Sequence, residues 1–242
     1  MHAPFLILQT GEPVPELRRH RGFPHWIRVS GEIPRDGTDV INVANGEPLP
    51  ERVPYAGIFV TGSPAMVTDR QAWSESTAEW LRGRIAAGIP TLGICYGHQL
   101  IAHALGGTVD NNPAGREIGT VEITRSMTEE DPLMQGMPAQ FPAHASHMQS
   151  VIHLPDDAVV LARSALEPHQ AVRYAPNCWG LQFHPEFSTQ ITRTYVKARA
   201  ARIQEEGGDV DSLLGTIRST PEARGLLRRF VRIAHRRLLG KT

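Results

Sequence analysis

The sequence GICYGHQ at residues 93–99 decides how the rest of this 242-residue chain is organised. It follows a short apolar run at 89–92 and precedes apolar residues at helical spacing over 100–105. A buried strand, a glycine-flanked turn and a helix form a nucleophile elbow, whose strained turn exposes one side chain at the carboxyl end of the strand. The N–H groups and positive dipole end of the helix face that side chain. The stretch therefore predicts that Cys95 is a nucleophile with a lowered pKa.

A second motif, FHPE at residues 183–186, supplies the partners that a cysteine nucleophile needs. A lone cysteine is usually a small buried apolar residue, so Cys95 alone would not indicate catalysis. Residues two apart on a strand point to the same face, which predicts that His184 and Glu186 project together. A histidine base oriented by a carboxylate activates a thiol. Together the two motifs indicate a triad of Cys95, His184 and Glu186.

Composition is that of an ordinary globular protein, with 40% apolar residues, 21% charged residues and zero formal net charge. We therefore expect no nucleic acid and no membrane as a partner. No apolar run reaches the roughly 18 residues of a membrane span, and the N-terminus lacks a signal-peptide pattern, so we expect a cytoplasmic protein.

Cysteine and histidine usage points away from metal and disulfide chemistry. The two cysteines make no disulfide framework, and Cys178 is expected to be structural. His144, His147 and His153 lie in a region expected to be a loop, without a carboxylate or cysteine at ligand spacing. We expect no metal and no cofactor.

The first hundred residues alternate between apolar runs and helical patterns. Strands are predicted at residues 5–9, 39–43, 56–60 and 90–94. Helices are predicted at 71–87 and 97–105, and a helix interrupted near Gly22 and Pro24 is expected within 14–30. Such alternation implies a parallel sheet with helices on both faces and its site at the carboxyl ends of the strands.

The second half of the chain changes character. Short β-type runs at 118–123, 158–161 and 170–174 predict hairpins or an antiparallel edge on the sheet. From residue 189 the pattern is helical, with a break at 207–208 and a final basic amphipathic helix, expected to pack through its apolar side. We expect a single domain over 1–242, with a core at about 1–190 and a helical extension at 191–242. The arginine-rich end is an alternative dimer or partner surface.

These motifs resemble those of the class I, or triad, glutamine amidotransferases, and are similar to the glutaminase domain of GMP synthase. The resemblance rests on residues 93–99, 183–187 and VTGSP at 60–64, and covers about 1–190. It implies a flavodoxin-like three-layer α/β fold and assigns Cys95 as nucleophile, His184 as base and Glu186 as its orienter. The other implied site residues are Gly62 and Tyr96, whose backbone N–H groups form the oxyanion hole, and Gln99, Ser146 and His147, which bind substrate.

One segment departs from the family pattern. Residues 145–151 match a Ser-His-Gly-Asp-x-Val-like stretch that closes the glutamine pocket, but Met148 stands where glycine is common and Gln149 where aspartate is common. These departures affect the expected substrate contacts and leave the triad intact.

The resemblance implies hydrolysis of the glutamine side-chain amide to glutamate and ammonia through a cysteinyl γ-glutamyl thioester. The chain has no phosphate-binding GxxxxGK[ST] loop, so a separate synthase chain would accept the ammonia. One alternative with the same triad is a γ-glutamyl peptide or conjugate hydrolase.

Two further alternatives concern the function of the chain. Separately, a homodimer is possible. An esterase of the α/β-hydrolase type would use the same elbow, but its order is nucleophile, acid, histidine, whereas this chain has Cys, His, Glu. A non-catalytic regulatory subunit would be expected to have lost a member of the triad, and all three are present.

Overall fold

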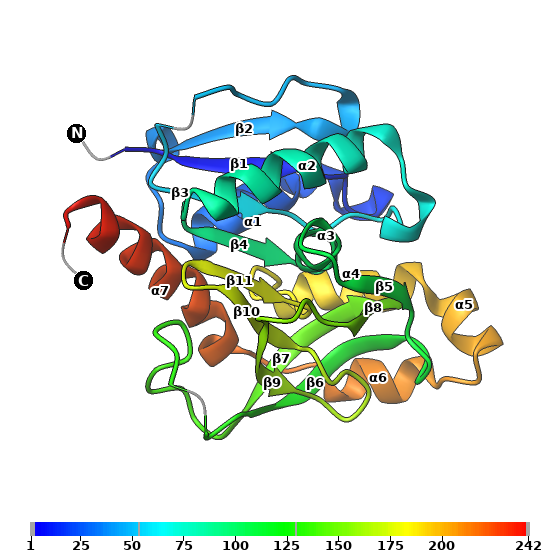
Figure 1. The fold of residues 1–242 in the computed structure, drawn as a ribbon. Coiled ribbons are helices and arrows are strands. Elements are labelled where there is room, and N and C mark those ends of the chain that lie inside the picture. The colour runs from blue at the N-terminus through cyan, green and yellow to red at the C-terminus, as the bar shows by residue number, and fades with distance from the viewer. Residues whose placement is uncertain (1–2, 53, 129, 241–242) are drawn as a thin grey trace.

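A mixed β-sheet runs through the molecule (Figure 1). The computed structural model describes residues 3–52, 54–128 and 130–240. In these ranges nine strands form the sheet in the order β2-β1-β3-β4-β11-β10-β9-β6-β7, and β5 and β8 pair separately. With helices on both faces, this arrangement confirms the predicted three-layer α/β fold.

The parallel half of the sheet comes mainly from the first hundred residues. Its strands are β1 (Phe5–Gln9), β2 (Thr38–Asn42), β3 (Gly57–Val60), β4 (Thr91–Ile94) and, from later in the chain, β11 (Cys178–Leu181). Successive residues of β1 enter different cores, because Phe5 and Ile7 pack on one face and Leu6 and Leu8 on the other. Burial on both faces explains the continuous apolar runs that predicted these strands.

The antiparallel half extends the sheet beyond β11, as the sequence predicted. Its strands are β10 (Ala171–Ala175), β9 (Val159–Arg163), β6 (Glu117–Arg125) and β7 (Gln140–His147). A separate antiparallel pair consists of β5 (Thr108–Asn111) and β8 (Gln149–His153), which are far apart in the sequence.

The expectation of a loop around His144, His147 and His153 is wrong. His144 and His147 belong to β7, and His153 ends β8. Buried β7 residues include Ala143 and Ala145. Small and polar residues give little β-type signal, so pairing with β6 and β5 decided these strands rather than local propensity.

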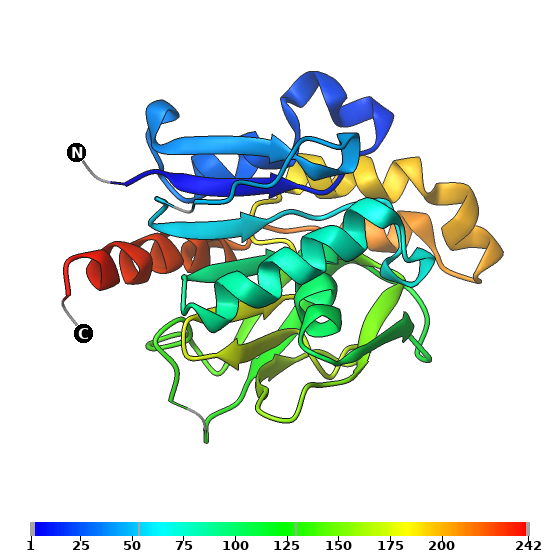
Figure 2. The same ribbon diagram turned by 45° about the horizontal axis from the view of Figure 1, so that its top comes forward.

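Helices cover both faces of the parallel half. α2 (Ala72–Ala86) and α3 (Tyr96–Ala104) pack on one face, and α1 (Gly22–Ser30) and α7 (Pro221–Leu238) on the other. Figure 2 shows α2 crossing in front of the sheet with α7 behind it. The remaining helices are α4 (Thr189–Ala198), α5 (Ala200–Glu205) and α6 (Val210–Thr216).

The two terminal helical regions largely follow the prediction. Residues 14–30 are interrupted at Arg21, where φ is +69°, between a 3₁₀ turn at Pro15–His20 and α1. Pro24 lies in the first turn of α1, where no intrahelical N–H is needed. The basic helix α7 packs through its apolar side, as predicted, with Phe230 buried against Phe5 and Trp179. No helix within the described ranges is long and apolar enough to cross a membrane.

Candidate active site

The predicted elbow is formed at the carboxyl end of β4. Cys95 follows directly with φ +51° and ψ −103°, and α3 begins at Tyr96. This backbone conformation is strained for a residue with a side chain, and such strain concentrates at functional positions. The Cys95 N–H donates to the carbonyl of Leu181 on β11 at 2.8 Å. The turn is therefore held in place by the neighbouring strand.

The two glycines of the elbow allow helix and strands to approach closely. A Cβ on Gly93 would lie 2.4 Å from the carbonyl oxygen of Gly97, and one on Gly97 would lie 2.3 Å from that of Val60. Neither distance is compatible with a side chain. The glycines in the motif therefore reflect the close contact of α3 with β4 and β3.

His184 and Glu186 meet beside Cys95, although not on a strand. β11 ends at Leu181, and both residues lie in the turn that follows it, so the expected strand geometry is wrong. Pro185 between them has no N–H to donate to a strand ladder. The chain turns back, and His184 Nδ1 lies 2.8 Å from Glu186 Oε1. The His184 N–H donates to the His144 carbonyl on β7 at 2.7 Å, which fixes the turn.

The charges of this cluster favour a thiolate and an imidazolium. Burial acts to raise the pKa of Cys95, but the charge of His184, its hydrogen bond to the thiol and the charge of His147 outweigh it and lower that pKa. For His184, burial acts to lower the pKa, whereas Glu186 and Cys95 raise it above the usual value. The resting pair therefore resembles other activated cysteine–histidine pairs.

Aromatic residues that sequence reasoning missed hold the His184 ring. Phe187 stacks on it with ring centroids 4.0 Å apart, and Phe23 from α1 lies parallel at 6.3 Å. Tyr195 of α4 stacks on Phe187 in turn. The only sequence signal for this aromatic stacking was the position of Phe187, directly after the FHPE motif.

Gly62 and Tyr96, the two residues of the predicted oxyanion hole, both lie close to Cys95. A Cβ on Gly62 would be 3.0 Å from His184 Cε1 and 3.8 Å from Cys95 Cβ, so this backbone borders both residues. Tyr96 is the first residue of α3. Among the residues that the structure describes, neither N–H donates a hydrogen bond. Both are therefore available to an oxygen of a bound substrate.

A cavity of about 170 Å³ beside Cys95 contains the predicted substrate residues Gln99, Ser146 and His147 in its lining. Gln99 Nε2 donates to the Gln149 carbonyl at 2.8 Å and to Gln182 Oε1 at 2.9 Å, which leaves its own oxygen as an acceptor. Both ring nitrogens of His147 contact protein acceptors, so this ring has no donor left for substrate.

The side chain of Gln149, which stands where aspartate is common in the family, forms hydrogen bonds with residues 67 and 68. Its Oε1 accepts from the Val67 N–H at 3.1 Å, and its Nε2 donates to Thr68 Oγ1 at 2.7 Å. The amide supplies both an acceptor and a donor, whereas an aspartate carboxylate would only accept. This departure from the family pattern thus has a structural reason in this chain.

A second cavity of about 300 Å³ opens on the His184 side of Cys95. Residues 12–15, Phe23, Tyr195 and Arg199 contribute to its walls. Arg199, between α4 and α5, lines both cavities. Across residues 3–52, 54–128 and 130–240, no group of three or more His, Cys, Asp or Glu residues could hold a metal ion.

Comparisons with known proteins identify the family of the chain. The profile of the family "Glutamine amidotransferase class-I" matches residues 33–201. One subunit of the glutamine-hydrolysing GMP synthase of Methanopyrus kandleri is 32% identical over 172 residues, which cover 70% of this chain and 87% of that protein. The glutamine-hydrolysing GMP synthase of Aeropyrum pernix is 36% identical over 143 residues, but the match spans only 26% of its length.

Solved structures with the same fold cover nearly the whole chain. A glutamine amidotransferase from Thermotoga maritima superposes with a TM-score of 0.72 at 21% identity, over 97% of this chain and 98% of that one. One from Methylobacillus flagellatus gives a TM-score of 0.69 at 22% identity, over 99% and 95%. Given the family match over residues 33–201, the chain belongs to the class-I glutamine amidotransferase family.

Proposed function

We propose that the protein hydrolyses the side-chain amide of glutamine to glutamate and ammonia, with Cys95 as nucleophile, His184 as acid and base, and Glu186 as orienter. The observation that carries the proposal is a buried cysteine at a positive-φ elbow beside a histidine that is hydrogen-bonded to a carboxylate at 2.8 Å. Class-I membership makes an amide the expected substrate group.

The first half-reaction forms an acyl-enzyme. The Cys95 thiolate attacks the amide carbon, and the N–H groups of Gly62 and Tyr96 stabilise the oxyanion. Loss of one such donor typically costs about 10²–10³-fold in rate. The His184 imidazolium then gives its proton to the leaving nitrogen, so that ammonia departs and a γ-glutamyl thioester remains.

The second half-reaction regenerates the resting pair. Neutral His184 takes a proton from water, and the resulting hydroxide attacks the thioester carbon. The thiolate leaves, glutamate is released, and His184 is again an imidazolium. No metal takes part. A thiol that must stay reduced suits the cytoplasm.

The ammonia is proposed to pass to a separate acceptor chain. Two relatives that the match covers to 87% and 85% of their length are named as single subunits of GMP synthase, whereas the chain spans 26% of the Aeropyrum pernix synthase. A second synthase chain that uses ammonia is therefore the expected type of partner.

The cavity on the His184 side favours a second candidate, a γ-glutamyl peptide or conjugate hydrolase. Ammonia needs little room, but this cavity measures about 300 Å³ and borders Cys95. Such a volume can hold a larger amine as leaving group. The triad and the chemical steps would be unchanged.

The test is release of ammonia and glutamate from glutamine, and of amines from γ-glutamyl peptides. We expect turnover of at least one substrate, abolished in Cys95→Ala and retained in Cys178→Ala, which removes the other buried cysteine. Turnover of peptides alone would select the second candidate. Absence of turnover together with a Cys95 that a glutamine-like alkylator leaves unmodified would contradict both.

A further inference from the structure

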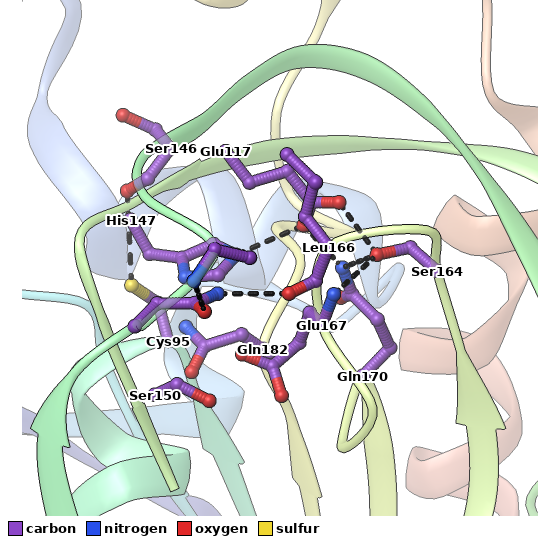
Figure 3. A network of polar contacts seen from close by, with 12 residues as sticks. Cys95, Glu117, Ser146, His147, Ser150, Ser164, Leu166, Glu167, Gln170 and Gln182 are labelled. Atoms are coloured by element: carbon purple, nitrogen blue, oxygen red, sulfur yellow. Dashed lines mark hydrogen bonds and ion pairs between the residues drawn. The ribbon is translucent and has the colours of Figure 1, made fainter. Parts of the chain in front are cut away.

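A second buried histidine–glutamate pair, His147 and Glu117, lies next to Cys95 (Figure 3). It is distinct from the pair of His184 and Glu186. Glu117 begins β6 and His147 ends β7, and the two are paired across the ladder. They are 3% and 5% exposed, and His147 Nε2 lies 2.9 Å from Glu117 Oε2. Burying two ionisable groups is costly unless each charge is compensated, so their protonation states can be deduced from their partners.

Hydrogen-bond donors surround the Glu117 carboxylate. The hydroxyl of Ser164 already accepts from the Glu167 N–H and from Gln170 Nε2, both at 3.1 Å. Its own proton therefore goes to Glu117 Oε1, at 2.5 Å. Gln170 Nε2 donates its other proton to Glu117 Oε2, also at 2.5 Å. Because donors face both oxygens, these contacts favour the carboxylate form of Glu117.

Both ring nitrogens of His147 face atoms that can only accept. Nδ1 lies 3.0 Å from the carbonyl oxygen of Gln149, and Nε2 faces the ionised Glu117. A neutral imidazole carries one N–H, whereas two N–H groups are needed here. His147 is therefore an imidazolium. In agreement, its pKa is raised: burial acts to lower it, but the hydrogen bond and charge of Glu117 prevail.

This cation is adjacent to the nucleophile. Cys95 Sγ lies 4.0 Å from the carbonyl oxygen of Ser146, the residue before His147. The Gln149 carbonyl that accepts from His147 also accepts from Gln99 on α3, at 2.8 Å. The pair thus ties the β7–β8 turn to the elbow helix while placing a positive charge near the sulfur.

We propose that Glu117 and His147 are positioning residues for Cys95. The carboxylate keeps His147 protonated, and the imidazolium both fixes the β7–β8 turn against the nucleophile and stabilises its thiolate alongside His184. The proposal rests on Cys95 being the nucleophile of the proposed function. It assigns to His147 an electrostatic role in place of a direct substrate contact through its ring.

Other ionisable groups face this pair and Cys95, and each must be counted. Around His147 these are Glu117 on β6, Glu167 in the β9–β10 loop, His98 on α3 and Cys95 itself. Burial, with smaller effects of His169 and His147, lowers the pKa of His98 to about 3, so His98 stays neutral near pH 7. Around Cys95 the charged groups are His184, Glu186 and His147, and the cavity beside it is also lined by Arg116, Arg199 and Arg202.

The test is the rate at which iodoacetamide alkylates Cys95 between pH 5 and 9, because only the thiolate reacts. Glu117→Gln removes the charge but keeps the shape, and a neutral His147 can then accept from the new amide. Loss of a neighbouring opposite charge shifts a pKa by about one unit or more. We expect the midpoint of the alkylation profile to rise by about one pH unit, with about tenfold slower alkylation below it.

Control variants separate this effect from general damage to the fold. Glu122→Gln makes the same change on the same strand, at an exposed residue paired with Arg218 at 3.0 Å, and should leave the midpoint unchanged. Ser164→Ala removes one donor to Glu117 and should shift the midpoint partway in the same direction. If Glu117→Gln does not fold, the midpoints of the alkylation profiles of Ser164→Ala and His147→Gln test the proposal instead.

An unchanged midpoint in folded variants would overturn the proposal, even if the alkylation rate changed equally at all pH values, because that pattern indicates a structural role alone. The measurement needs no turnover. A shifted midpoint in a protein that turns over neither glutamine nor γ-glutamyl peptides, and whose Cys95 a glutamine-like alkylator leaves unmodified, would therefore refute the proposed function while supporting this proposal.

Discussion

At the residue scale, the site depends on where three side chains are held. Cys95 adopts φ +51°, and His184 and Glu186 approach each other through a turn that contains Pro185. The carboxylate of Glu186 lies 2.8 Å from Nδ1 of the His184 ring. It contributes to the raised pKa of His184, after the opposing effect of burial.

Replacement of Glu186 should therefore weaken catalysis without removing the nucleophile. In Glu186→Gln the pKa of His184 falls, so less imidazolium is present near pH 8 to protonate the leaving amine. We expect kcat to drop by roughly 10²–10⁴-fold, with its alkaline limb displaced to lower pH. Glu122→Gln, at an exposed position of β6 outside both cavities, should leave the kcat profile unchanged, and a Glu186→Gln enzyme with wild-type kcat would contradict the assigned role.

At the scale of elements, the close approach of α3 to β3 and β4 forms the elbow. Gly97 lies so near β3 that a Cβ would be 2.3 Å from the Val60 carbonyl oxygen. By contrast, Gly83 is in the exposed part of α2, with nothing within 4 Å of an added Cβ. The same amino acid is thus required in one helix and replaceable in the other.

The two glycines make a matched pair of substitutions. Gly97→Ala forces α3 away from β3 and should lower the free energy of unfolding by about 1–3 kcal/mol or more, because overpacked sites relax poorly. Gly83→Ala should raise it by about 0.5–1 kcal/mol, because alanine loses less backbone entropy in a helix. Urea unfolding measures both. Equal changes in the free energy of unfolding for Gly97→Ala and Gly83→Ala would contradict the explanation that α3 contacts β3 closely at Gly97.

At the scale of the whole molecule, the site lies where the parallel and antiparallel halves of the sheet meet. Cys95 directly follows β4, the neighbouring β11 leads to His184, and the β7–β8 turn lines the pocket. Because the residues of the site are concentrated at this junction, several histidines are buried there, and their charge states differ. Burial first, then His184, lowers the pKa of His144 to about 4, and that of His98 is lowered to about 3.

These neutral buried histidines should make the fold sensitive to acid. Below the ordinary pKa of 6.5 the unfolded chain binds protons that folded His98 and His144 do not, so the free energy of unfolding falls as pH decreases. Each contributes a slope of up to about 1.4 kcal/mol per pH unit. The raised pKa values of His147 and His184 add stability that is complete below pH 6.5 and lost only as pH rises.

Urea unfolding from pH 6.5 to 5 tests this expectation above the range in which most carboxylates titrate. The exposed His153, at the end of β8, provides the control, and His153→Asn should keep the slope. A free energy of unfolding that stays constant over this interval would show that the buried histidines titrate normally.

Much of this protein follows from its sequence alone. The apolar runs of β1, β3 and β4 are continuous because both faces of a parallel strand are buried, and GICYGHQ encodes an elbow through its glycines. The family was therefore readable in advance, whereas the triad of Cys95, His184 and Glu186 stays a prediction. Strand signals were weak in β7 and β8, where Ala143, Ala145 and His147 pack without a marked apolar pattern.

The tertiary structure alone decided how the site is held together. Residues 184–186 looked like a strand, but the turn around Pro185 and the Phe187 ring set their geometry. Glu117 gave no signal, because its role arises only when β6 and β7 pair and bring it to His147. Local sequence determines which backbone shapes are accessible, whereas charge compensation in a buried site depends on partners far apart in the chain.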